Sequence, residues 1–419
     1  MPPAARALAL LAALAQVPLE TAIADLRSPD RDTRLRAVLL LKDAAHPDAA
    51  RPLVPLIGDP DDEIQYEAIG AELNAFLAEK VVSKRRVGGV FEVRNRVMAE
   101  AAFSAGPFAL GVQQVPAEVM SALLSAVPDD NAYIGMEALY AFGALAPNAA
   151  GTELRDLLEK AAPEFAAFVG ASEPQQRIAA LRVIGRVFAR RVGEPAVPSA
   201  VGDAVVVALN DQDRLVREAA AATIGAMRYE RAIQAVTELF QHFRTGVVAD
   251  QLFDALARIG HGSARPVMIA ALDRGSAARK RSAVEGLARM NDATALAAAE
   301  EALNRDRNES LRLARAFASA WFGKGGLDEI VNAAAHGRLR EQAFGYMCEL
   351  APGRAAMLGR HAKDPDAVIR RDVADALGMS GDAAALPIVE PLTRDGDPRV
   401  SQAAARAAAR LRAAPRRPS

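Results

Sequence analysis

Apolar residues recur along the chain at the spacing of one helical face. After Val216, the residues four and five places later are Ala220 and Ala221, while Arg217 and Glu218 lie between them. Apolar positions spaced in this way form the buried stripe of an amphipathic helix. Runs that alternate apolar and polar residues, as a half-buried strand requires, are few. The pattern therefore predicts an all-α chain.

This helical pattern is repeated. Three segments, 211–216, 364–369 and 395–400, read Asp-x-Asp, a short gap and then an aliphatic residue. We use that residue as an anchor, and from Gln251 onward the anchors lie about 30 residues apart. Twelve anchors cover the chain: Leu35, Ile64, Val97, Ile134, Gln176, Val216, Gln251, Ser282, Leu311, Leu339, Ile369 and Val400. A period of this length predicts helix pairs, each with a helix A, a turn and a longer helix B that begins near the anchor. One pair cannot bury its apolar face alone, so successive pairs stack on a continuous core.

Small residues occupy fixed places relative to the anchors. Four residues after the anchor, eight of the twelve repeats have Ala, and five residues after it every repeat is apolar. Nine residues after the anchor, six repeats have Gly: Gly106, Gly143, Gly185, Gly225, Gly260 and Gly378. A glycine column marks either a close contact between helices or a helix end, because both favour a residue without a side chain.

The segment from Asp364 through Ile369 to Gly378 is close to the consensus of a known repeat. It resembles HEAT repeats, particularly the short HEAT-like repeats first noted in phycobilisome lyases, and the resemblance covers residues 19–412. It implies a right-handed α-solenoid (superhelix) of about 11–12 HEAT-like helix pairs, with the B helices on the concave side. It implies no particular ligand.

The repeats divide the chain into five predicted parts. Residues 1–15 are a possible signal peptide, 16–79 are N-terminal HEAT-like repeats, and 80–116 are an irregular basic segment or a degenerate repeat. Residues 117–412 are further HEAT-like repeats, and 413–419 are a disordered basic tail. The first part has one Arg, an apolar stretch and Ala13-Leu14-Ala15 before Gln16, as in a secretory signal with a small-residue cleavage site. The alternative is a first capping helix, which should have a polar outer face. With cleavage the protein is periplasmic or secreted; without it the protein is cytoplasmic.

Composition and charge narrow the function. The 51 basic and 52 acidic residues nearly cancel, so the large positive excess typical of nucleic-acid binding is missing. Cys348 is the one cysteine, which excludes an intramolecular disulfide and a cysteine metal cluster. It lies in the column of small residues, so we interpret it as a small core residue, with a nucleophile as the alternative. The five histidines lack both zinc spacing and the His-Glu pairs of HEAT-repeat deoxyhypusine hydroxylases. No catalytic residue, metal site or cofactor is predicted.

The Asp pairs and an Arg column have two interpretations each. The Asp pairs suit N-caps of the B helices, since the further oxygen ligands of a calcium loop are missing. An Arg follows the anchor in six repeats, and HEAT-like repeats commonly pair such an Arg with the turn Asp of a neighbour. The alternative is a basic stripe for phosphate or acidic peptides, which would raise the net charge. The predicted ladder consists of Arg36, Arg177, Arg217, Arg312, Arg340 and Arg370 with Asp211, Asp364 and Asp395.

Residues 80–96 have the strongest local charge bias in the chain. The six basic residues are Lys80, Lys84, Arg85, Arg86, Arg94 and Arg96. They form either a solvated basic face or a partner-binding insertion, because insertions in solenoids often lie on the binding face. The leading hypothesis is a non-catalytic scaffold that binds a protein or peptide along its concave face. The alternative is nucleic-acid or anionic-ligand binding through this segment, with affinity that falls steeply with salt.

Overall fold

A computed structural model describes residues 18–78, 98–149, 151–189, 197–305 and 307–414. The chain divides into two units, residues 1–154 and 155–419, which we describe separately. Among the described residues every regular element is a helix, and β-structure is limited to two isolated bridges. None of these helices is long and apolar enough to cross a membrane.

Unit 1 contains three helix pairs among its described residues. The B helices are α3 (Arg31–Ala44), α5 (Asp62–Phe76) and α8 (Ala132–Leu145), and neighbouring B helices pack against each other. Their A partners are α2 (Leu19–Asp25), α4 (Ala50–Leu53) continued by η2 (Val54–Gly58), and α7 (Ala117–Ser125). A further short helix, α6 (Ala99–Ala105), packs on α8, and α9 (Gly151–Lys160) contains the boundary with unit 2.

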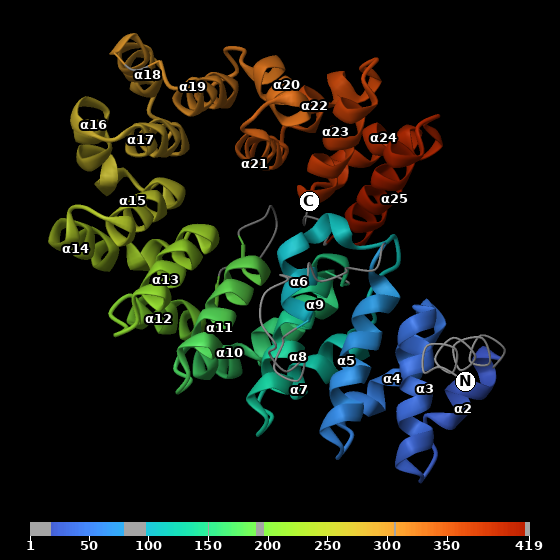
Figure 1. Cartoon of the computed structure of the whole chain (residues 1–419). Helices are drawn as coiled ribbons and strands as arrows, with labels where there is room; N and C mark the ends of the chain where they lie inside the picture. Colours follow the sequence, from blue (N-terminus) through green and yellow to red (C-terminus); the bar gives the residue numbers. More distant parts are fainter. Residues whose placement is uncertain (1–17, 79–97, 150, 190–196, 306, 415–419) are drawn as a thin grey trace, which may run out of the picture. The chain divides into compact units, whose positions relative to one another are not determined.

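Unit 2 contains eight helix pairs among its described residues. Its B helices are α11 (Pro174–Val187), α13 (Arg214–Met227), α15 (Val247–Ile259), α17 (Ala277–Arg289), α19 (Glu309–Trp321), α21 (Arg340–Leu350), α23 (Ala367–Met379) and α25 (Pro398–Ala413). Its A helices are α10 (Ala162–Val169), α12 (Ser199–Ala208), α14 (Ile233–Phe243), α16 (Arg265–Arg274), α18 (Thr294–Arg305), α20 (Leu327–His336), α22 (Ala355–Gly359) and α24 (Leu386–Val389). Figure 1 shows α14, α16 and α18 on the outer side of the arc of this unit and α15, α17 and α19 on the inner side. The predicted all-α solenoid is confirmed.

The glycine column serves both purposes that the sequence allowed. A Cβ added at Gly378 would lie 2.5 Å from the Cβ of Ala407 on the next B helix, so this glycine permits a close helix contact. Gly225 similarly faces Ala255 of the next B helix. Gly260, by contrast, ends α15 in the left-handed conformation, with φ of 67°. Cys348, predicted as a small core residue, is only half-buried.

The Asp pairs begin the B helices. In four pairs the second Asp is the N-cap and its carboxylate accepts backbone N–H groups of the first turn: Asp61, Asp213, Asp366 and Asp397. The first Asp of each of these pairs accepts the N–H of the second. In the remaining pair the first residue, Asp30, is the N-cap of α3. The repeat register at α3 is therefore two residues earlier than the predicted anchor Leu35, because the anchors of the other capped helices lie three residues after the N-cap.

Helix α5 packs against α8, although residues 77–131 lie between them in the sequence. Gln65 on α5 donates a hydrogen bond to Asp129 in the turn before α8, at 3.0 Å, so these two helices are consecutive B helices. The backbone leaves at Phe76 and returns at Gly111, where the Gly111 N–H donates to the Phe76 carbonyl at 2.8 Å. Whether the 80–116 region is an irregular basic segment or a degenerate repeat stays a prediction, because residues 79–97 lie outside the described residues. The predicted anchor Val97 itself lies outside the described residues.

Candidate functional site

Two of the predicted ladder arginines contact the turn Asp of the next repeat. Arg370 donates from Nε and Nη2 to Asp395, both at 2.8 Å, and its Nη1 donates to the carbonyls of its own turn. Arg177 donates from Nη2 to Asp211 at 2.9 Å and from Nη1 to its own turn in the same way. The hydrogen bond from Arg370 lowers the pKa of Asp395. Each arginine lies four residues after the N-cap residue of its helix, so it joins two turns.

At α3 the ladder residue is Arg34, which the sequence analysis missed. It donates to Asp59 at 2.9 Å and to the carbonyls of Ser28 and Pro29. The predicted Arg36 instead donates to Thr33 on its own helix at 3.1 Å. The cause is the early start of α3 at Asp30, which places Arg34 four residues after the N-cap residue. The sequence did contain a signal for this earlier register. Ser28 stands two residues before Asp30, where the other pairs have their first Asp, and it accepts the N–H of Asp30 at 3.2 Å.

The other predicted ladder residues make different contacts. Arg217 donates to the carbonyls of its own turn, because Arg244 stands where the next turn would have its Asp. Arg312 pairs with Glu329 at 3.1 Å, and Arg340 pairs with Asp372 on α23 at 3.0 Å. Arg340 is the first residue of α21, and it also donates to the carbonyl of Ala335 at 3.2 Å. The predicted Asp364 accepts the N–H of Asp366 at 2.9 Å.

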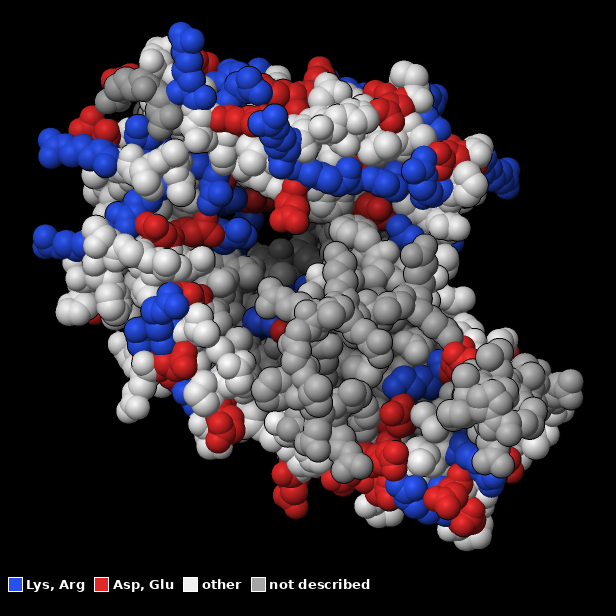
Figure 2. All heavy atoms as spheres, viewed as in Figure 1, with Lys and Arg blue, Asp and Glu red and all other residues white. Residues whose placement is uncertain are grey.

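The six basic residues predicted as a binding site all lie between residues 79 and 97. Lys80, Lys84, Arg85, Arg86, Arg94 and Arg96 are all outside the described residues. On the described surface, acidic and basic side chains are interleaved over the face shown in Figure 2, in keeping with the near-neutral net charge.

The inner side of unit 2 holds a charged cluster that links helices far apart in sequence. We define the clasp as Arg228, Glu285, Arg289, Tyr346 and Glu349. Arg289 on α17 donates two hydrogen bonds to Glu349 on α21, from Nε at 2.7 Å and from Nη2 at 2.9 Å. Arg228, at the end of α13, also donates to Glu349, and the Tyr346 hydroxyl donates to Glu285. The clasp therefore ties α13, α17 and α21 together.

The clasp is buried and its charges are matched. The side chain of Arg289 is 5% exposed and that of Glu349 is 15% exposed. Burial alone would raise the pKa of Glu349, but Arg289 and then Arg228 lower it to about 2. Burial, followed by Glu285, raises the pKa of Tyr346 well above its ordinary value. Groups held so firmly in one protonation state are poor general acids or bases near neutral pH. The clasp thus has the character of a structural bridge across the concave side.

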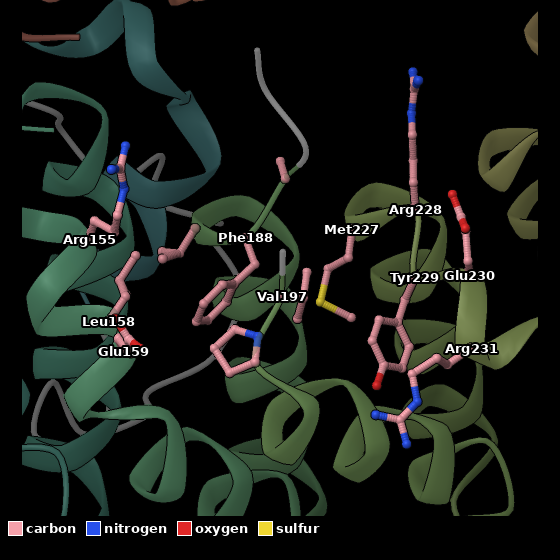
Figure 3. Close-up of a pocket in the computed structure, with 13 residues that line it drawn as sticks. Arg155, Leu158, Glu159, Phe188, Val197, Met227, Arg228, Tyr229, Glu230 and Arg231 are labelled. Atoms are coloured by element: carbon pink, nitrogen blue, oxygen red, sulfur yellow. The ribbon is translucent and has the colours of Figure 1, made fainter. Parts of the chain in front are cut away.

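A pocket lies beside the clasp, at the edge of unit 2. Its volume is about 570 Å³, within the ~300–1,000 Å³ of typical ligand sites. Figure 3 shows it between α9, the end of α11 and the segment that follows α13. Its apolar lining consists of Leu158, Val187, Phe188, Ala189, Val197, Pro198, Met227 and Tyr229, and its charged residues are Arg155, Glu159, Arg228, Glu230 and Arg231.

The Tyr229 wall of the pocket is held in place by α12. The Tyr229 hydroxyl donates to Asp203 at 2.7 Å, and Arg231 pairs with the same carboxylate at 3.2 Å. The ring packs over Gly202, where any Cβ would overlap it. On the opposite wall, Phe188 makes an edge-to-face contact with Phe165, with ring centroids 5.8 Å apart. Both aromatic walls are thus fixed by contacts with neighbouring helices.

No motif in the sequence indicated the clasp or the pocket. The pair Glu285 and Arg289 has the i, i+4 spacing of a helix-surface ion pair, which was the available signal. The pocket residues come from four separated segments, and no motif connects them.

Two regions of the chain are similar to known repeats. The family model for HEAT repeats matches residues 162–257 and 338–417. A crystal structure of an engineered protein is similar over 94% of this chain and 98% of its own, with 16% identity and a TM-score of 0.40. A designed armadillo repeat protein in complex with the peptide (KR)4 is similar over 66% of this chain and 100% of its own, with 17% identity and a TM-score of 0.38. No curated protein matches the chain.

Proposed function

We propose that this chain is a non-catalytic scaffold that binds a protein or peptide partner in the pocket of unit 2. Two of its regions match the model for HEAT repeats. The observation that carries this proposal is an apolar pocket of about 570 Å³ with two fixed aromatic walls. Concave, mostly apolar sites with a few polar groups are the usual form of binding sites. Solenoids commonly present such surfaces to other chains.

Because of the clasp, we propose a site away from the middle of the concave side. Glu349 is already occupied by two arginines, and Glu285 by Tyr346 and Arg289. A partner that bound there would have to replace buried ion pairs, and separating such a pair costs about 3–5 kcal/mol. The pocket needs no such replacement. We therefore place the partner at the edge of unit 2, while the sequence alone suggested the whole concave face.

Export is the second part of the proposal. The pattern of Met1 to Ala15 supports a cleaved secretory signal, which would place the protein in the periplasm or outside the cell.

A photo-crosslinking experiment tests the binding site. A crosslinking amino acid replaces Ala189, which lines the pocket, or Gln402, which is exposed on α25 and serves as the control. We expect a defined protein adduct from position 189 that position 402 does not give. The adduct should disappear when Phe188→Glu places a charge in the pocket. The same adducts from both positions, or an adduct that Phe188→Glu leaves unchanged, would contradict the proposal.

A further inference from the structure

Arg155 lines the pocket and has two guanidinium nitrogens without a hydrogen-bond partner among the described residues. These nitrogens are Nε and Nη2, and both are buried. The other two arginines of the pocket are engaged, Arg228 with Glu349 and Arg231 with Asp203. Figure 3 shows the Arg155 guanidinium pointing away from Glu159, the acidic residue one turn later on α9. Arg155 thus differs from the other pocket arginines.

The two buried nitrogens of this guanidinium group favour one kind of ligand. Leaving a buried donor without an acceptor is unfavourable, and a bound acceptor would relieve this. A carboxylate fits best, because it accepts two parallel hydrogen bonds from the planar fork of an arginine. The pocket lining also includes apolar residues, among them Leu158, Phe188 and Met227. The pocket therefore offers an apolar surface and one anion-binding group to the same ligand.

We propose that the pocket binds a peptide segment in which a large apolar side chain lies next to a carboxylate. The apolar side chain fills the space between Phe188 and Met227, and the carboxylate is bound by Arg155. The carboxylate comes from Asp, Glu or the C-terminus of the partner. This inference rests on the proposed function, because it names the segment that the scaffold recognises.

The polar groups around the pocket favour a peptide over a fatty acid, which also combines an apolar chain with a carboxylate. Glu159, Glu230 and Arg231 lie at the same pocket as the apolar lining. A peptide backbone can exchange hydrogen bonds with such groups, whereas a lipid chain would desolvate them without compensation.

Fluorescence anisotropy of labelled peptides on the full chain tests the proposal. The probes are short peptides with a central Leu-Phe followed by Asp or by Asn, and peptides that end in Leu-Phe as the free acid or the amide. We expect at least one acid to bind about tenfold or more tightly than its neutral counterpart, because hydrogen bonds to charged groups are the stronger ones. The pair that shows the preference identifies the source of the carboxylate.

Variants assign this preference to Arg155. Arg155→Gln should remove the preference and leave the affinity for the neutral peptide unchanged, whereas Arg155→Lys should retain part of it. The matched control is Arg274→Gln, since Arg274 is 90% exposed and lies outside the pocket. Unchanged helical circular dichroism shows that each variant is folded. A preference for acids that survives Arg155→Gln would overturn the inference.

The outcomes separate this inference from the proposed function. Equal affinity for acid and neutral peptides, both lost in Phe188→Glu, would overturn the inference and leave the peptide-binding pocket in place. No peptide binding at all, or binding that Phe188→Glu does not affect, would overturn both. Binding of decanoate in the absence of any peptide binding would also overturn both.

Discussion

Glu349 is the residue whose replacement should cost most in the clasp. Its pKa is lowered from 4.5 to about 2, chiefly because Arg289 and Arg228 outweigh the effect of burial. Each pH unit corresponds to about 1.4 kcal/mol, so the charged form contributes about 3 kcal/mol to folding. Because the folded-state pKa is the lower one, this contribution is complete above about pH 4.5 and is lost as the pH falls to about 2. Glu349→Gln should therefore lower the free energy of unfolding by about 3 kcal/mol at pH 7.

The chain provides its own reporter for this measurement. Trp321 is the one tryptophan, and it lies on α19 between the helices that the clasp joins. Its Nε1 donates to Asn291 at 3.0 Å, and Arg354 lies over its ring at 4.7 Å from the centroid. Urea titration followed by tryptophan fluorescence gives the free energy of unfolding of this region at each pH. The control is Glu390→Gln, because Glu390 and its partner Arg412 are 50% and 59% exposed, and exposed pairs contribute only about 0–1 kcal/mol.

The pH dependence is the strictest part of this test. The difference between wild type and Glu349→Gln should be constant from pH 7 to about 5 and shrink below about pH 4.5. A difference at pH 7 no larger than that of Glu390→Gln, or a difference that grows on acidification, would refute the reasoning about the clasp.

Four further predictions concern the ladder, the pocket and the residues outside the described ranges. Arg34→Met should destabilise the N-terminal repeats by about 1–3 kcal/mol, because it removes a half-buried ion pair and leaves the Asp59 carboxylate without its partner. Arg36→Met should change the stability little. Thermal unfolding of the two variants compares them, and equal effects would contradict the corrected register. Gly202→Ala should displace the tyrosine ring that packs on it and weaken binding in the pocket, as peptide anisotropy would show; unchanged affinity would mean that this wall plays no part. If the protein is exported, the intact mass of the mature protein should correspond to a chain that starts at Gln16. A mass that includes Met1 excludes cleavage there. Reversing the charges of residues 80–96 should abolish any salt-sensitive binding of duplex DNA in gel shifts; if wild type binds none at low salt, the nucleic-acid alternative fails.

The sequence predicted the features of the fold that depend on neighbouring residues. The Asp pairs identified the starts of α5, α13, α23 and α25, because N-capping is a local interaction. The same local logic explains the error at α3: Asp30 and Asp32 are both suitable caps, and choosing between them shifts the register by two residues.

The site depended on contacts that sequence spacing does not encode. Arg289 and Glu349 are 60 residues apart, and their pairing follows from the curvature that several helix pairs add together. The aromatic walls of the pocket, Phe188 and Tyr229, are ordinary core residues by pattern. They face a cavity because α11 and α13 end there and α9 forms the third side.

The clasp also changes how unit 2 should fold. A solenoid stabilised by contacts between adjacent repeats folds and unfolds in steps along its length, since each repeat depends on its neighbours alone. Arg228 and Glu349 are 121 residues apart, which gives unit 2 a non-local contact of a kind that slows folding. The repeats between α13 and α21 then form a single cooperative block, because the loss of any one helix pair would separate Arg228 from Glu349. Deleting one repeat from this block should cost more than deleting one from α23 to α25, where contacts between neighbours suffice.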